Sequence, residues 1–191
     1  ASMGIGWLSE SLENKSGEDL PDLFISAGFD MFFDKSRFGR FREENFFEDL
    51  TSFSHLHRDF DQEDIRLKDP RKQYSMIGVV PAVFLVNTKE LGNRKVPRSW
   101  DDILSDEFKN SISLPVSDFD LFNAILLNIY KSHGEAGIAQ LGRNMQKSMH
   151  PAEMVKSHMK LMERPSVTIM PYFFTKMVKD GGPMVAVWPE D

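Results

Sequence analysis

The sequence has 191 residues, of which 41% are hydrophobic and 27% charged, as in an ordinary globular protein with room for one large domain or two small ones. Its net charge of -6 and its lack of clustered Lys and Arg argue against a nucleic-acid partner. The absence of cysteine excludes disulfides, thiolate metal sites and cysteine nucleophiles. No apolar run reaches the roughly eighteen residues of a membrane span, and residues 1–7 show no signal peptide, which leaves the cellular location open.

The first elements in the chain are a short helix over residues 6–14 and a strand that begins after Pro21. This strand ends in three small residues, Ser26, Ala27 and Gly28. In open α/β sheets, ligands bind beyond the carboxyl ends of strands, and small side chains let a ligand approach the backbone. The triplet is therefore a candidate ligand contact, and the alternative is an ordinary tight turn from strand to helix.

Residues 31–60 are rich in phenylalanine and predict irregular helix and loop, with aromatic rings that need a surface to cover them. The acidic run over 59–64 lacks the glycine of a calcium loop, and Pro70 stands where the last ligand belongs, so a solvated face is expected. His55 and His57 have no further ligand near them in sequence and predict a surface pair. No metal site is expected.

The stretch from Tyr74 to Asn87 is apolar and uncharged, which predicts buried strand. Gly78 and Pro81 interrupt it, so two strands or one bent strand are expected, because proline removes a ladder donor. A bend here would pass the chain from one lobe to another. We therefore expect a partial first lobe with its hinge strand over residues 1–82 and a second lobe over 83–191.

The second half alternates strands and helices, which predicts an α/β fold with a doubly wound sheet. A helix starts after the cap Ser99, with Asp101 and Asp102 placed to complement its dipole. The further elements are a polar turn over 87–93, strands over 111–116, 166–170 and 184–189, and helices over 118–130, 134–145, 151–162 and 171–178.

Ser117 ends one of these strands and is the natural cap of the next helix. The free N–H groups at this helix start are suited to an oxyanion, although the Ser117 side chain commonly fills that role itself. Asp118 favours a ligand of the opposite charge, because a carboxylate at the site attracts a cation or an amine. The charge of the ligand stays open.

Three segments resemble bacterial extracellular solute-binding proteins of the type 2 periplasmic-binding class, closest to the group for iron(III), thiamine and polyamine transport. They are Val-Pro-Ala-Val-Phe-Leu-Val-Asn-Thr-Lys over 80–89, Val-Pro-Arg-Ser-Trp-Asp-Asp-Ile-Leu over 96–104 and Val-Ala-Val-Trp-Pro-Glu-Asp over 185–191. The resemblance implies two α/β lobes joined by crossing strands, the first of them incomplete in this sequence, and a ligand held without catalysis or cofactor. The implied ligand-binding residues are Ser26, Ala27, Gly28, Ser117, Asp118, Pro171 and Tyr172.

The same resemblance implies a permease of an ABC importer in the inner membrane as partner and a periplasmic or extracellular location, lipid-anchored or secreted. The sequence departs from the iron-binding members at Tyr172, because Phe173 and Phe174 follow where a second tyrosine is typical. One phenolate is too few for a ferric ion.

Two other functions fit the same scaffold. One is a ligand-sensing domain of a regulator or receptor, and the other is an enzyme, although no phosphate-binding glycine loop, Gly-x-Ser-x-Gly elbow or paired histidine ligands occur. The final strand ends at the last residues, so we expect missing continuation, an exposed sheet edge and self-association of the fragment.

Overall fold

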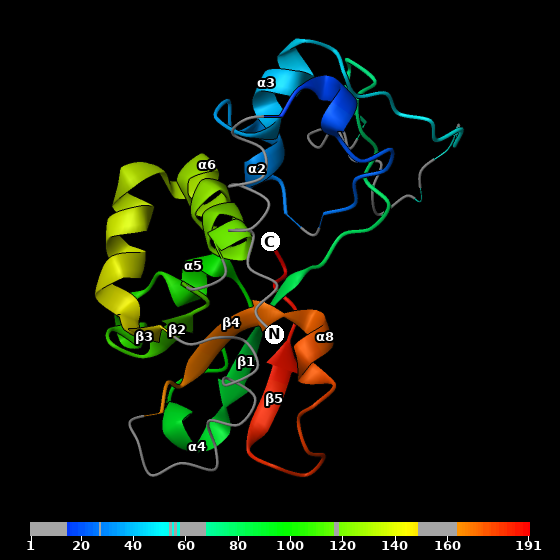
Figure 1. The fold of residues 1–191 in the computed structure, drawn as a ribbon. Coiled ribbons are helices and arrows are strands. Elements are labelled where there is room, and N and C mark those ends of the chain that lie inside the picture. The colour runs from blue at the N-terminus through cyan, green and yellow to red at the C-terminus, as the bar shows by residue number, and fades with distance from the viewer. Residues whose placement is uncertain are drawn as a thin grey trace. The chain divides into compact units, whose positions relative to one another are not determined.

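The computed structural model describes residues 15–26, 28–53, 55, 57, 68–116, 119–148 and 164–191 (Figure 1). The chain divides into two compact units, Ala1–Val79 and Val80–Asp191, and each has its own hydrophobic core. The boundary expected from the sequence follows residue 82. The predicted helices over 6–14 and 151–162 and the acidic run over 59–64 lie outside the described residues.

The first unit contains short helices joined by loops, as predicted for the phenylalanine-rich region. They are η1 (Gly17–Asp19), α2 (Asp30–Phe33) and α3 (Phe38–Glu43). The core is small and aromatic: Met31, Phe38 and Phe41 are buried, and the Phe24 and Phe38 rings lie 4.3 Å apart. Part of the phenylalanine of this third of the chain is therefore covered by other rings, whereas Phe46 stays 50% exposed.

A network of five polar residues, the polar clasp, ties the end of α3 to the segment that follows residue 68. It consists of Arg42, Asn45, Asp69, Arg71 and Gln73. Arg42 Nη2 donates to Asp69 at 3.3 Å, and the Asp69 side chain is only 1% exposed. Gln73 Nε2 donates to the Arg42 carbonyl at 2.8 Å, and the Gln73 N–H donates to Asp69 at 3.1 Å. The buried carboxylate thus has several donors, which offset the cost of removing it from water.

Two strand predictions in this unit are wrong. The segment after Pro21 is not a strand in its described part, and Leu23 and Ile25 are 75% and 68% exposed. The expected buried strand from Tyr74 does not form before Ala82 either, and Ile77 is 73% exposed. Both segments have the apolar residues of a strand, but among the described residues neither pairs with a strand, and the second segment forms only the isolated bridge of Ser75 with Lys68.

The second unit contains a mixed five-stranded sheet in the order β3-β2-β4-β1-β5. Its strands are β1 (Ala82–Asn87), β2 (Ile112–Leu114), β3 (Met145–Ser148), β4 (Val167–Pro171) and β5 (Met184–Val187). β1 runs antiparallel to both of its neighbours, β4 and β5, whereas β2 runs parallel to β3 and β4. Strands that are separated by most of the unit's sequence thus lie side by side, as the orange, green and red ribbons in Figure 1 show.

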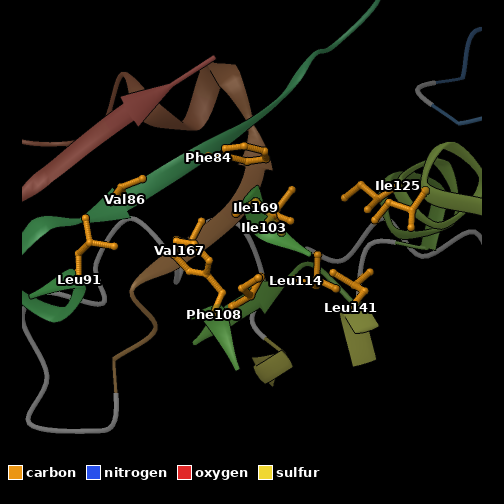
Figure 2. Packing of buried hydrophobic residues seen from close by; sticks show 12 residues of the cluster. Phe84, Val86, Leu91, Ile103, Phe108, Leu114, Ile125, Leu141, Val167 and Ile169 are labelled. Atoms are coloured by element: carbon orange, nitrogen blue, oxygen red, sulfur yellow. The ribbon is translucent and has the colours of Figure 1, made fainter. Parts of the chain in front are cut away.

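β1 is buried on both faces, which explains its unbroken apolar sequence. Phe84 and Val86 face the larger core with Ile103 and Ile125, as Figure 2 shows. Val83 and Leu85 face a smaller cluster on the other side of the sheet, which includes Met170, Met184 and side chains of the segment after β4. Pro81, which has no N–H for the ladder, directly precedes the strand.

The helices among the described residues of the second unit are α4 (Thr88–Leu91), α5 (Trp100–Ile103), η3 (Asp106–Phe108), α6 (Phe119–Asn144) and α8 (Tyr172–Thr175). The predicted cap of α5 is confirmed, because Ser99 accepts the Asp102 N–H and Asp102 lies in the first turn. The polar turn expected over 87–93 is the short helix α4 instead, because the Asn87 side chain accepts the N–H groups of Lys89 and Glu90.

The two helices expected on either side of residue 134 form α6, which bends at Gly134 (φ 62°, ψ -158°), so its two arms lie at an angle to one another (Figure 1). This backbone conformation favours glycine. β3 was not predicted, since its residues Met-Gln-Lys-Ser continue directly from the helix.

Candidate functional site

The candidate site lies at the end of the five-stranded sheet where β2, β4 and β5 terminate and β1 begins. We call this end the carboxyl edge. β2 and β4 are parallel, with Ile112 opposite Val167, so the residues that follow both strands reach the same edge. Ala82 at the start of β1 pairs with Pro171 at the end of β4. The carboxyl end of parallel strands is where α/β folds place their ligands.

Pro171 and Tyr172 lie at this edge, as the chain turns from β4 into α8. The Tyr172 N–H donates to the carbonyl of Pro81 at 2.9 Å, which fixes the start of α8 to the residue before β1. The N-cap residue of α8, Pro171, makes no side-chain capping bond. Tyr172 is half-buried and packs against the smaller core, so its position is set by the sheet.

Two residues that the sequence did not single out complete the site. The Trp188 ring lies 4.5 Å from the Tyr172 ring, and Lys176 Nζ lies 4.9 Å from the centre of the Tyr172 ring. A hydrogen bond to the Tyr172 side chain raises the pKa of the exposed Lys176 ammonium. We call these three residues the Tyr172 cluster. It joins a positive charge to aromatic surface at the end of two strands.

The other predicted site residues are divided between the first unit and the residues that are not described. Ser26 and Gly28 lie in the first unit just before α2, where the Gly28 N–H donates to Ser26 Oγ at 3.2 Å. Ala27, Ser117 and Asp118 lie outside the described residues. The last described residue before the latter pair is Val116, which follows β2. The structure thus brings together Pro171 and Tyr172, and ligand binding by all seven residues stays a prediction.

The described residues include no group of three or more His, Asp or Glu side chains that could hold a metal ion. His55 and His57 are both exposed. Tyr172 is followed by the exposed Phe173 and by Phe174, which packs on the smaller core. In the part of the chain that the structure covers, no helix combines the length and apolar character needed to cross a bilayer.

The mixed α/β sheet of the second unit and the likeness to solved structures define the fold class as that of type 2 periplasmic binding proteins. The ferric binding protein from Campylobacter jejuni matches 97% of this chain with a TM-score of 0.62 and 16% identity, over 58% of its own length. The apo ferric ion-binding protein A of Pasteurella haemolytica matches 64% of this chain with a TM-score of 0.51 and 11% identity, over 42% of its length.

A two-component system protein that mediates signal transduction has the same fold. It matches 74% of this chain with a TM-score of 0.52 and 18% identity, over 47% of its own length. The chain thus spans about half the length of the solved structures that it matches. A comparison with curated protein sequences gives no significant match.

The family itself is defined by sequence. The family model of bacterial extracellular solute-binding proteins matches residues 18–191, which is most of the chain. The chain belongs to this family of extracellular binding proteins.

Proposed function

We propose that the chain is the ligand-capturing part of the solute-binding component of a bacterial ABC importer, and that it holds a small polar or charged ligand without catalysis. The family match over residues 18–191 carries the proposal. The partner is then a permease of the inner membrane, and the protein works in the periplasm or outside the cell, lipid-anchored or secreted. The units correspond in this proposal to two lobes, divided near residue 82.

The Tyr172 cluster supports a binding role for the second unit. It lies at the carboxyl edge of the sheet, and it combines a half-buried ring with an exposed charge and an exposed indole. Pro171, Ser117 and Asp118 are the further proposed contacts in this unit, and Ser26, Ala27 and Gly28 are those in the first unit. A ligand can favour a closed form only through contacts that the open form lacks, so both units must contribute to binding.

A thermal-shift screen of the complete protein tests this role. The probes are phosphate, citrate, spermidine, thiamine and ferric citrate, each far above a typical dissociation constant. One of them is expected to raise the midpoint of unfolding, because a ligand that binds only the folded state stabilises it. If none of these classes does so, the capturing role is wrong.

A pair of tyrosine variants links the screen to the site. Tyr172→Ala is expected to abolish the shift, whereas Tyr130→Ala, which changes a 53% exposed tyrosine of α6, leaves it unchanged. Equal shifts in the two variants would show that the ligand binds away from the carboxyl edge.

Ligand sensing is a second candidate, because the fold is shared with a two-component system protein. Likeness at 18% identity concerns the fold alone. The neighbouring genes and the rest of the gene discriminate the two functions: a permease gene next to it favours transport, and a kinase or DNA-binding segment in the same gene favours sensing.

A further inference from the structure

The charge of the Tyr172 cluster is positive, and the part of the chain that the structure describes provides it with no partner of opposite sign. Lys176 Nζ lies over the Tyr172 ring, and among the described residues no carboxylate lies within 4.0 Å of this ammonium group. An ammonium that is next to an aromatic face and lacks a carboxylate partner can accept an anionic group from a ligand.

The two carboxylates that follow Trp188 in the sequence bind residues other than Lys176. Glu190 pairs with Arg98 Nη1 at 3.2 Å. Asp191 accepts the N–H of Trp100 through both of its side-chain oxygens, at 2.9 and 3.1 Å. These contacts attach the end of the chain to the start of α5, so the two acidic groups nearest to Trp188 in sequence already have donors of their own.

The aromatic part of the cluster offers a flat surface. Trp188 is 51% exposed, and its contact with Tyr172, tilted by 49°, holds the indole in place. An indole that is fixed on one side and exposed on the other can stack against a ligand ring at low entropic cost, since ring pairs attract at centroid separations of about 4.5–7 Å.

We propose that the Tyr172 cluster binds a small organic anion with a flat conjugated ring, which stacks on the Trp188 indole while its carboxylate or phosphate group faces the Lys176 ammonium. This inference rests on the proposed capturing function and narrows its ligand class. A cationic ligand would place its charge beside Lys176, where like charges repel. A bare metal ion would require several anionic oxygens, and the cluster contributes one phenol.

Four small probes separate the charge from the ring. Benzoate has both, cyclohexanecarboxylate has the charge without the conjugated ring, acetate has the charge alone, and benzylamine has the ring with the opposite charge. Calorimetric titration of the complete protein is expected to give the tightest binding for benzoate, with phenyl phosphate as the second source of the same chemistry. Cyclohexanecarboxylate is expected to bind about fivefold more weakly, the size of one ring contact.

Two lysine variants locate the anion. Lys176→Gln is expected to weaken benzoate binding by about fivefold, as the loss of one exposed charge contact predicts. Lys89→Gln is the matched control, because Lys89 is an exposed lysine of α4, which follows β1 at the opposite edge of the sheet. Trp188→Leu is expected to remove the difference between benzoate and cyclohexanecarboxylate while it keeps the dependence on Lys176.

The outcomes distinguish this inference from the function on which it rests. If benzylamine binds as tightly as benzoate, or if Lys176→Gln binds benzoate as the unchanged protein does, the organic-anion assignment is wrong. If spermidine or ferric citrate stabilises the protein and no ring-bearing anion does, the capturing role stands and the assignment fails. If no probe of any class binds, both are wrong.

Discussion

The two units are stabilised by different kinds of interaction. The second unit buries whole strands: Val83, Phe84, Leu85 and Val86 are each at most 1% exposed. The first unit has no such strand among its described residues and depends on a few phenylalanine rings and on the polar clasp around Asp69. The comparison shows that apolar residues alone do not make a strand, because Leu23 and Ile25 are as apolar as β1 and stay exposed.

The largest expected effect is in the sheet. Phe84→Ala should lower the free energy of unfolding of the second unit by about 3–5 kcal/mol, because it leaves a cavity beside Trp100, whose ring lies 5.0 Å away. Urea unfolding followed by circular dichroism measures it. Leu127→Ala, at a 60% exposed position of α6, is the control and should change little. If Phe84→Ala lowered the free energy of unfolding only slightly, the neighbouring core side chains would have moved in to fill the cavity.

The next effect breaks the polar clasp. Asp69→Asn should cost about 2–3 kcal/mol, because Arg42 and two backbone N–H groups lose a charged acceptor in a buried place. Hydrogen exchange should locate the loss in the first unit and leave β1 protected. Asp22→Asn, at an exposed position, should have almost no effect. If exchange in the sheet rose equally, the two units would not be separate in stability.

A smaller effect concerns a single helix cap in the second unit. Ser99→Ala removes the acceptor of the Asp102 N–H and should cost about 1 kcal/mol. Ser105 also precedes a helix, η3, but its side chain makes no capping bond, so Ser105→Ala is the matched control. Thermal unfolding of the two variants compares them directly, and equal midpoints would assign no energetic role to the cap.

The smallest effect depends on pH. A hydrogen bond from the Thr51 hydroxyl, and then one from Ser75, lowers the pKa of Asp49 in the first unit. A carboxyl whose folded pKa lies below its unfolded value stabilises the fold above the unfolded pKa of about 4 and loses this contribution as pH falls. Asp49→Asn should therefore be less stable than the unchanged protein at pH 7, with the difference shrinking below about pH 4. A constant difference across this range would exclude the carboxylate as its source.

The sequence predicted four of the five strands because each is an apolar run next to a turn residue or a proline, as β1 is next to Pro81. It missed β3, whose polar residues pair only because β2 lies beside them. It placed a strand after Pro21 because the local pattern does not show whether another strand lies beside it. Pairing is a tertiary property, and no window of sequence contains it.

Only part of the candidate site could be predicted from the sequence. Tyr172 was found from the resemblance to binding proteins. Trp188 and Lys176 were not, because Trp188 meets Tyr172 only through the sheet, in which β1 lies between β4 and β5. The spacing of Lys176 from Tyr172 is compatible with a contact on one helix face, but many such pairs occur by chance. The three-dimensional structure was needed to show that Tyr172, Lys176 and Trp188 lie together.

The position of β1 in the sheet also sets an order of events during synthesis. This strand leaves the ribosome well before both of its partners, because Val86 pairs with Val167 on one side and with Val185 on the other. For the time needed to translate the intervening residues, an uncharged strand with two open edges has no native neighbour, which is the kind of segment that chaperones bind. The yield of folded protein should therefore depend on how fast the residues between β1 and β5 are translated.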